Sequence, residues 1–177
     1  MRDAQPVLTQ MVISPKVNKD GGNPLKDVQL YKSVIGALLY LNHKRPDIAY
    51  SVNRVAQYMH APCTQHWAAV KHILRYLYGT LYYGLVFFKA GLGLHLVAFI
   101  YVNWAINVDD RHSISAFCVF LGVNLVSWGS KCQRSVSRLT TEAEYRAFAD
   151  VVADVVLDSS LVDRYGDFVL KNSLYLE

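Results

Sequence analysis

Residues 96–145 read LVAFIYVNWAINVDDRHSISAFCVFLGVNLVSWGSKCQRSVSRLTTEAEY, and this stretch decides the fold that the sequence predicts. Three apolar runs in it predict short strands, at 96–104, 116–121 and 125–128. A helix is predicted to start at Thr140-Thr141-Glu142, because a hydroxyl and a carboxylate suit the free N–H groups and the positive end of a helix. Adjacent strands followed by such a helix predict an α/β module. A strand-borne acid facing the helix would be able to share a divalent metal ion with it.

The composition is that of an ordinary protein with enough apolar material for a core. The chain has 177 residues, a formal net charge of +4 and 53% hydrophobic residues, which suits one domain or two small ones. The three cysteines, Cys63, Cys118 and Cys132, are too few for a disulfide framework and are expected to be reduced thiols. The sequence has neither a signal-peptide pattern nor an apolar run of membrane-spanning length. We therefore expect an intracellular protein that is not secreted.

The N-terminal half predicts a linker and then helices. Residues 1–26 are polar and interrupted by Pro and Gly, which predicts an extended linker. Helices are predicted over 28–43, 48–59 and 65–79, the first capped by Asp27 and the third by Thr64. In the first helix, helical spacing relates Leu30, Val34, Ala37, Leu38 and Leu41.

The third predicted helix carries two basic residues one turn apart, Lys71 and Arg75. An ordinary amphipathic helix with a solvated side explains such a pair most simply. The functional alternative is a basic face that follows a nucleic-acid backbone.

Residues 104–147, WAINVDDRHSISAFCVFLGVNLVSWGSKCQRSVSRLTTEAEYRA, resemble the ribonuclease H segment of copia-type retrotransposon Pol polyproteins. In that family the first strand carries Ser-Asp-Ala-Asp before Trp-Ala, and its first Asp is a metal ligand. Here residues 100–103 read Ile-Tyr-Val-Asn, so the resemblance puts Tyr101 at the ligand position. The Thr-Glu pair of the helix start is present as Thr141 and Glu142.

Residues 31–87, YKSVIGALLYLNHKRPDIAYSVNRVAQYMHAPCTQHWAAVKHILRYLYGTLYYGLVF, resemble the end of the reverse transcriptase in the same polyproteins. This resemblance implies a helical thumb-like and connection region, in which Lys71 and Arg75 would grip a template–primer duplex. Residues 81–88 would form a short hairpin or edge strand. By the resemblance, the polymerase motif Tyr-Val-Asp-Asp lies upstream of the residues present here. Residues 107–110, Asn-Val-Asp-Asp, imitate it, but Asp109 and Asp110 match a loop of the ribonuclease H segment and are expected to make loop and surface ion-pair contacts.

Together these patterns predict an α/β (α+β) chain in three parts. Residues 1–26 are the linker, 27–90 a helical thumb-like and connection-like segment of a reverse transcriptase, and 94–177 a truncated ribonuclease H-like mixed sheet with a packed helix. Trp104 and Trp128 each end an apolar run and are expected to be partly buried. Along the helix, Val152, Val155 and Val156 are expected to face inward, and 173–177 is expected to be a fourth strand.

A ribonuclease H mechanism holds two divalent ions between several carboxylates. By the resemblance, Glu142 is the retained helix acid of that set, and Glu177 overlies a further acid only loosely. Tyr101 cannot replace a carboxylate, because a phenol with a pKa of about 10 is protonated at neutral pH. We therefore expect no metal site and no cofactor, the ancestral Mg²⁺ site having been lost.

The first functional hypothesis is a degenerate, truncated Pol region without polymerase or nuclease activity. The second is a retained module that binds an RNA–DNA hybrid or another nucleic acid weakly through basic residues, Lys71, Arg75, Lys131, Arg134 and Arg138. An active nuclease would require a longer natural chain. No membrane partner is expected, and the truncated sheet predicts self-association through its exposed edge and face.

Overall fold

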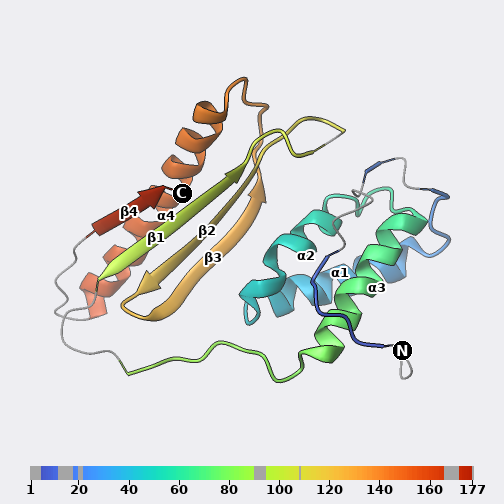
Figure 1. The fold of residues 1–177 in the computed structure, drawn as a ribbon, viewed down its shortest axis with the longest axis horizontal. Helices are drawn as coiled ribbons and strands as arrows, with labels where there is room; N and C mark the ends of the chain where they lie inside the picture. The colour runs from blue at the N-terminus through green and yellow to red at the C-terminus, as the bar shows by residue number, and fades with distance from the viewer. Residues whose placement is uncertain are drawn as a thin grey trace. The chain divides into compact units, whose positions relative to one another are not determined.

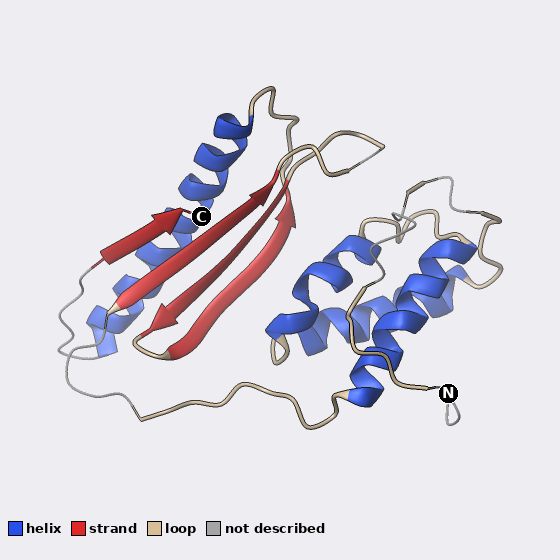
Figure 2. Cartoon of the chain, viewed as in Figure 1, coloured by secondary structure: helices blue, strands red, loops and turns tan. Residues whose placement is uncertain are grey.

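The computed structural model describes residues 5–11, 18–19, 22–89, 95–107, 109–165 and 172–176, and the side chains of 158–165 and 172–176 are left out of the description. The chain forms two compact units, Met1–Leu85 and Val86–Glu177 (Figure 1). The first unit is helical, whereas the second is a sheet with one helix (Figure 2). The predicted mixed α/β class is therefore confirmed.

Three helices surround the core of the first unit: α1 (Val28–Asn42), α2 (Ala49–Ala56) and α3 (Thr64–Gly79). Asp27 caps α1 as predicted, since its carboxylate accepts a 2.8 Å hydrogen bond from the backbone N–H of Leu30. The buried core consists of side chains from these three helices and from the 3-10 turn before α2. They are Tyr31, Ile35, Leu38, Ile48, Val52, Val55, Val70, Ile73 and Tyr76.

Details of the predicted helices need correction. The buried face of α1 centres on Tyr31 and Ile35, and Leu30 is 47% exposed, because the aromatic ring rather than the leucine fills the core. The second predicted helix begins as a 3-10 turn, Pro46–Ile48, and α2 ends at Ala56. Helix α3 starts at Thr64, but its N-cap is Cys63, whose N–H donates to Nδ1 of His66 at 3.0 Å.

The described part of the stretch 1–26 packs on these helices without forming a helix or a ladder. The ring Nε2 of His72 bonds the carbonyl of Thr9 at 2.9 Å, and Leu25 N–H donates to the carbonyl of Pro62 at 2.9 Å. An isolated bridge joins Pro24 to Cys63. The stretch thereby covers one side of α3.

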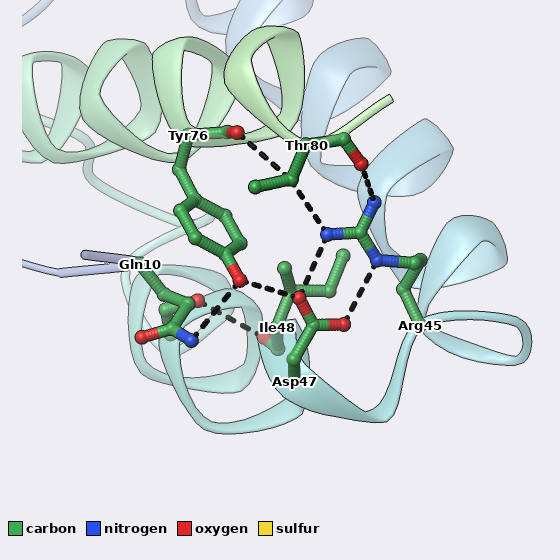
Figure 3. A network of polar contacts seen from close by, with 7 residues as sticks. Gln10, Arg45, Asp47, Ile48, Tyr76 and Thr80 are labelled. Carbon is green, nitrogen blue, oxygen red and sulfur yellow. Dashed lines mark hydrogen bonds and ion pairs between the residues drawn. The ribbon is translucent and has the colours of Figure 1, made fainter. Parts of the chain in front are cut away.

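A partly buried ion pair between Arg45 and Asp47 lies in the turn after α1, and hydrogen bonds connect it to the end of α3 (Figure 3). Arg45, only 5% exposed, donates two hydrogen bonds to the Asp47 carboxylate, from Nη2 at 2.7 Å and from Nε at 2.9 Å. Its other hydrogen bonds go to Thr80, while Tyr76 donates its hydroxyl to Asp47 at 2.8 Å. Burial opposes ionisation of Asp47, but the hydrogen bonds from Arg45 and Tyr76 outweigh it and lower the pKa of this carboxyl.

The second unit is a sheet of strands in the order β3-β2-β1-β4. Strands β1 (Leu96–Asn103), β2 (Ile114–Leu121) and β3 (Asn124–Cys132) are antiparallel neighbours, and β4 (Asn172–Leu176) lies parallel to β1. Helix α4 (Thr140–Tyr165) packs on the sheet (Figure 1). The shared core is Leu96, Ala98, Ile100, Val119, Ala147, Val151 and Val155.

The predicted meander, its packed helix and the further strand are all present, with longer second and third strands. Trp128 is half-buried and Trp104 is 40% exposed, so both indoles are partly covered. The prediction that Val156 faces the core is wrong. Its side chain is 59% exposed, and Val151 is buried in the core instead. Residues 81–89 form neither the predicted hairpin nor an edge strand: they are in turn and irregular backbone, with no backbone ladder to another strand.

Asp47→Asn is expected to lower the free energy of unfolding at pH 7 by about 2 kcal/mol, because Arg45 stays buried without its counter-charge. The folded-state pKa of Asp47 is depressed, so its stabilisation is present above the unfolded pKa of about 3.9 and is lost as pH falls through the folded value. The difference between wild type and variant should therefore be constant above about pH 5 and shrink below about pH 4. Urea unfolding followed by far-UV circular dichroism measures both. Asp27→Asn is the matched control, since Asn caps a helix as well as Asp. A pH-independent difference would contradict the assignment.

Two glycine-to-alanine substitutions should change stability in opposite directions. A Cβ on Gly36, in α1, meets nothing within 4 Å, so Gly36→Ala should stabilise by about 0.5–1 kcal/mol through helix propensity. A Cβ on Gly129, in β3, would lie 2.7 Å from Cε1 of Phe117, so Gly129→Ala should destabilise by about 1–3 kcal/mol. Thermal unfolding of both variants checks this, and equal effects would show that the Phe117 ring yields freely.

Candidate functional site

Glu142 stands in the first turn of α4, where its carboxylate already has two partners. One oxygen, Oε2, accepts a 2.9 Å hydrogen bond from the backbone N–H of Arg138, and Oε1 forms a 2.6 Å ion pair with Arg146. Both side chains of the pair are 39% exposed. The carboxylate therefore binds a backbone N–H just before the helix, and its charge is neutralised by Arg146 one turn further along the helix.

Gln133 fixes the loop that leads into α4. Its Nε2 donates to the Ser115 hydroxyl and to the Ala143 carbonyl, each at 2.8 Å, and its Oε1 accepts from the Ser137 hydroxyl at 3.2 Å. The side chain is 8% exposed. Trp104, at the end of β1, donates its indole N–H to the Ser137 carbonyl at 3.1 Å. The helix start that carries Glu142 is thus held against β2 and the end of β1.

Sequence reasoning missed Gln133. Its partners Ser115 and Ala143 are eighteen and ten residues away, so no local spacing signals the contact. The available signal was its place in the SKCQRSVSR stretch, which is part of the quoted resemblance.

Tyr101 lies on the sheet face that does not pack on α4. Ala98 and Ile100 bury their side chains in the core shared with the helix, and side chains alternate along a strand. Tyr101 is accordingly 59% exposed. The position that carries a metal-binding Asp in the resembled family therefore does not face α4, contrary to the expectation of a strand residue facing the helix.

The open face of the sheet around Tyr101 is apolar. The rings of Phe99 and Phe120 meet edge to face, with centroids 6.0 Å apart, and Phe99 is still 40% exposed. Cys118 lies opposite Phe99 in the ladder, and burial raises the pKa of its thiol. A thiol kept protonated in this way is a poor nucleophile.

The residues at the expected metal position do not fit a pair of divalent ions. They offer the phenol of Tyr101, the amide of Asn103 and the carboxylate of Glu142, which Arg146 already neutralises. Two Mg²⁺ ions require several carboxylates to balance their charge. Among the described residues, no three His, Cys, Asp or Glu side chains are grouped to hold a metal ion. Glu177 lies outside the described residues.

The acids of the loop after β1 make local contacts. Asp110 Oδ1 accepts a 3.1 Å hydrogen bond from the backbone N–H of His112, and Asp109 and Asp110 are both exposed. Ala105 and Arg111 have positive φ angles of 48° and 59°, which turn the chain sharply here. Asp109 and Asp110 thus belong to a sharply turned surface loop.

The basic residues proposed for nucleic acid fall in both units. Lys71 is exposed and Arg75 half-buried on α3 of the first unit. In the second unit Lys131, Arg134 and Arg138 are exposed. Lys131 lies within β3, not in the connection after it, and its Nζ is 5.9 Å from the Phe117 ring centroid. Each unit thus presents its own basic side chains.

Comparison with known proteins finds relatives that match nearly the whole chain. The chain is 43% identical over 166 residues, or 94% of its length, to each of two retrovirus-related Pol polyproteins of Arabidopsis thaliana, those from transposons RE2 and RE1. It is also 41% identical over 127 residues to the secreted RxLR effector protein 161 of Plasmopara viticola, covering 89% of that protein and 71% of this chain. The chain spans 11% of the length of each of the two polyproteins.

No protein-family model and no solved structure matches the chain. In the described ranges, none of the helices has the length and apolar character of a membrane span. The family therefore rests on the relatives alone, and their agreement over 94% of the chain at 43% identity is decisive. The chain belongs to the retrotransposon Pol polyprotein family.

Proposed function

We propose that the chain is a catalytically silent region of a copia-type Pol polyprotein, which joins the end of a reverse transcriptase to a ribonuclease H-like module. The observation that carries this proposal is Tyr101, an exposed phenol where the resembled family has a metal-binding Asp. In this reading the first unit is the thumb-like and connection-like part. The second unit, Val86–Glu177, contains the nuclease-like part, residues 94–177.

The sheet topology supports the ribonuclease H-like assignment. Three antiparallel strands are followed by helix α4 and then by β4, which returns parallel to β1. Such a return needs a crossover, and α4 supplies it. The resemblance of residues 104–147 runs through this same meander and into α4.

The proposed lack of catalysis follows from the small number of carboxylates available to bind divalent ions. Two-ion hydrolysis needs carboxylates on both sides of the ions to position them for water activation. Tyr101 supplies no carboxylate, and the carboxylate of Glu142 is already bound to Arg146 and to the backbone N–H of Arg138. Each missing carboxylate leaves ion charge uncompensated, so ions would bind weakly and out of place.

The intact chain is expected to give no cleavage of an RNA–DNA hybrid above buffer with Mg²⁺ or Mn²⁺, followed by gel electrophoresis of end-labelled RNA. Tyr101→Asp alone should also fail, because the restored acid lies on the face away from α4. Glu142→Gln serves as the control for contaminating nuclease. Metal-dependent cleavage that disappears in Glu142→Gln would refute the proposal.

A second candidate function, binding of nucleic acid without cleavage, is favoured by helix α3. Its sequence, TQHWAAVKHILRYLYG, contains Lys71 and Arg75 and no acidic residue. Cations that reach solvent on one helix attract phosphates, and the sequence of α3 contains no carboxylate that would compete. An intracellular location would accompany such a role.

Lys71→Gln combined with Arg75→Gln is expected to weaken binding to an RNA–DNA hybrid. The slope of log K against log salt should fall by about 2, because each released counterion contributes about 0.9. Fluorescence anisotropy over a series of salt concentrations measures both quantities. The control is Lys26→Gln with Lys32→Gln, which removes the same charge from exposed positions before α1 and on it. Equal losses in the two double variants would show a non-specific charge effect.

A further inference from the structure

The residues before α1 pack along α3 in the opposite direction. We call the described part of this stretch the strap, residues 5–11, 18–19 and 22–26. Its early residues lie at the end of α3, where the Cβ of Pro6 is 2.8 Å from the position that a Cβ on Gly79 would take. Its later residues lie at the start of α3, where the N–H of Thr64 donates to the carbonyl of Asn23 at 3.0 Å. The strap is therefore attached to both ends of α3.

Two buried histidines of α3 hold the strap between these ends. His72 is 9% exposed, and its Nε2 bonds the carbonyl of Thr9 at 2.9 Å. His66 is fully buried, and its Nε2 bonds the carbonyl of Asn18 at 2.8 Å. Because a carbonyl oxygen only accepts, each ring must carry a proton on Nε2. Both imidazoles thus donate to the backbone of the strap.

His66 differs from His72 at its other ring nitrogen. Nδ1 of His66 accepts a 3.0 Å hydrogen bond from the backbone N–H of Cys63, which completes a capping box at the start of α3. A nitrogen that accepts from an N–H group cannot also carry a proton, so these two bonds fit only the neutral ring. Among the described residues, the hydrogen bonds of His72 involve Nε2 alone, and a second proton on that ring leaves them intact.

The surroundings of His66 oppose a positive charge on its ring. The Tyr58 ring stacks on the imidazole, with centroids 4.1 Å apart, and an aromatic face attracts a cation. However, the guanidinium of Arg54, a residue that is 4% exposed, already lies 6.0 Å from the Tyr58 centroid and would repel a second cation. Further titratable groups nearby are the thiol of Cys63, the phenol of Tyr31 and, beside Asn18 on the strap, the ammonium of Lys19.

We infer that His66 is a pH-dependent switch, which ties the strap to the start of α3 only while its ring is neutral. When Nδ1 takes a proton, two N–H groups point at each other and the ring must leave its place. Its departure breaks the bond to Asn18 and opens the capping box at Cys63 together. The strap then detaches from the start of α3, whereas His72 still holds it further along the helix. This switch goes beyond the two proposed functions and requires neither of them.

The test is native-state hydrogen exchange of the Cys63 and Thr64 amides in the full chain, followed by NMR. The opened state binds a proton that the closed state excludes, so opening becomes easier as the pH falls below about 6.5, the ordinary pKa of histidine. Between pH 7 and pH 5 the opening constant of both amides should rise about 25-fold. The amide of Lys44, bonded to the Leu41 carbonyl after α1, should show no such rise.

Matched variants assign the effect to one ring. His66→Gln keeps the capping box, because a glutamine at this position accepts from the N-cap N–H and does not titrate. This variant should lose the rise with falling pH. His72→Gln removes an imidazole from the same helix and should keep the rise, since the hydrogen bonds of His72 do not require a neutral ring.

The ring nitrogen chemical shifts of His66 in the wild-type chain provide a second readout, which decides the matter if His66→Gln does not fold. They should show the Nε2–H form at pH 7, with protonation of Nδ1 accompanied by loss of protection at Cys63. The inference is overturned by equal pH dependence in wild type and His66→Gln, by an Nδ1–H form at pH 7, or by a protonated His66 whose Cys63 amide stays protected.

Discussion

A strand can bury only every second side chain against one partner, and the second unit depends on how β1 meets this constraint. Its even-numbered residues from Leu96 to Ile100 pack with α4, so Phe99 and Tyr101 must point to the other face. The α4 face is apolar and closed. The chemistry of position 101 is therefore separated from the helix acid Glu142, and the phenol itself removes the charge that a metal would need.

Much of the fold could be predicted from the pattern of apolar residues. Apolar runs bounded by polar and turn residues predicted the strands of the meander, and the acid at Glu142 correctly marked the start of α4. The errors concern which face is buried and what is paired. Tyr31 displaced Leu30 from the core of α1, and the apolar run 81–88 found no strand to pair with. Both outcomes depend on tertiary partners that local propensity does not contain.

The candidate site was predictable only as a set of residue types. Sequence comparison with the resembled family marks Tyr101 and Glu142. The sheet face on which Tyr101 lies is known only from the packing of β1 on α4, and the partners of Glu142 only from the contacts at the helix start. The neutralisation of Glu142 by Arg146 could have been expected, since the two are one helical turn apart. The role of Gln133 could not, because it joins segments that are distant along the chain.

The central claim is that the residues around β1 and α4 no longer form a divalent-metal site. The most direct measurement is paramagnetic broadening of backbone amide NMR signals by substoichiometric Mn²⁺. The account predicts no selective broadening of the amides of 101–103 and 138–143, in wild type or in Glu142→Gln. Selective broadening of both stretches together, abolished by Glu142→Gln, would contradict it.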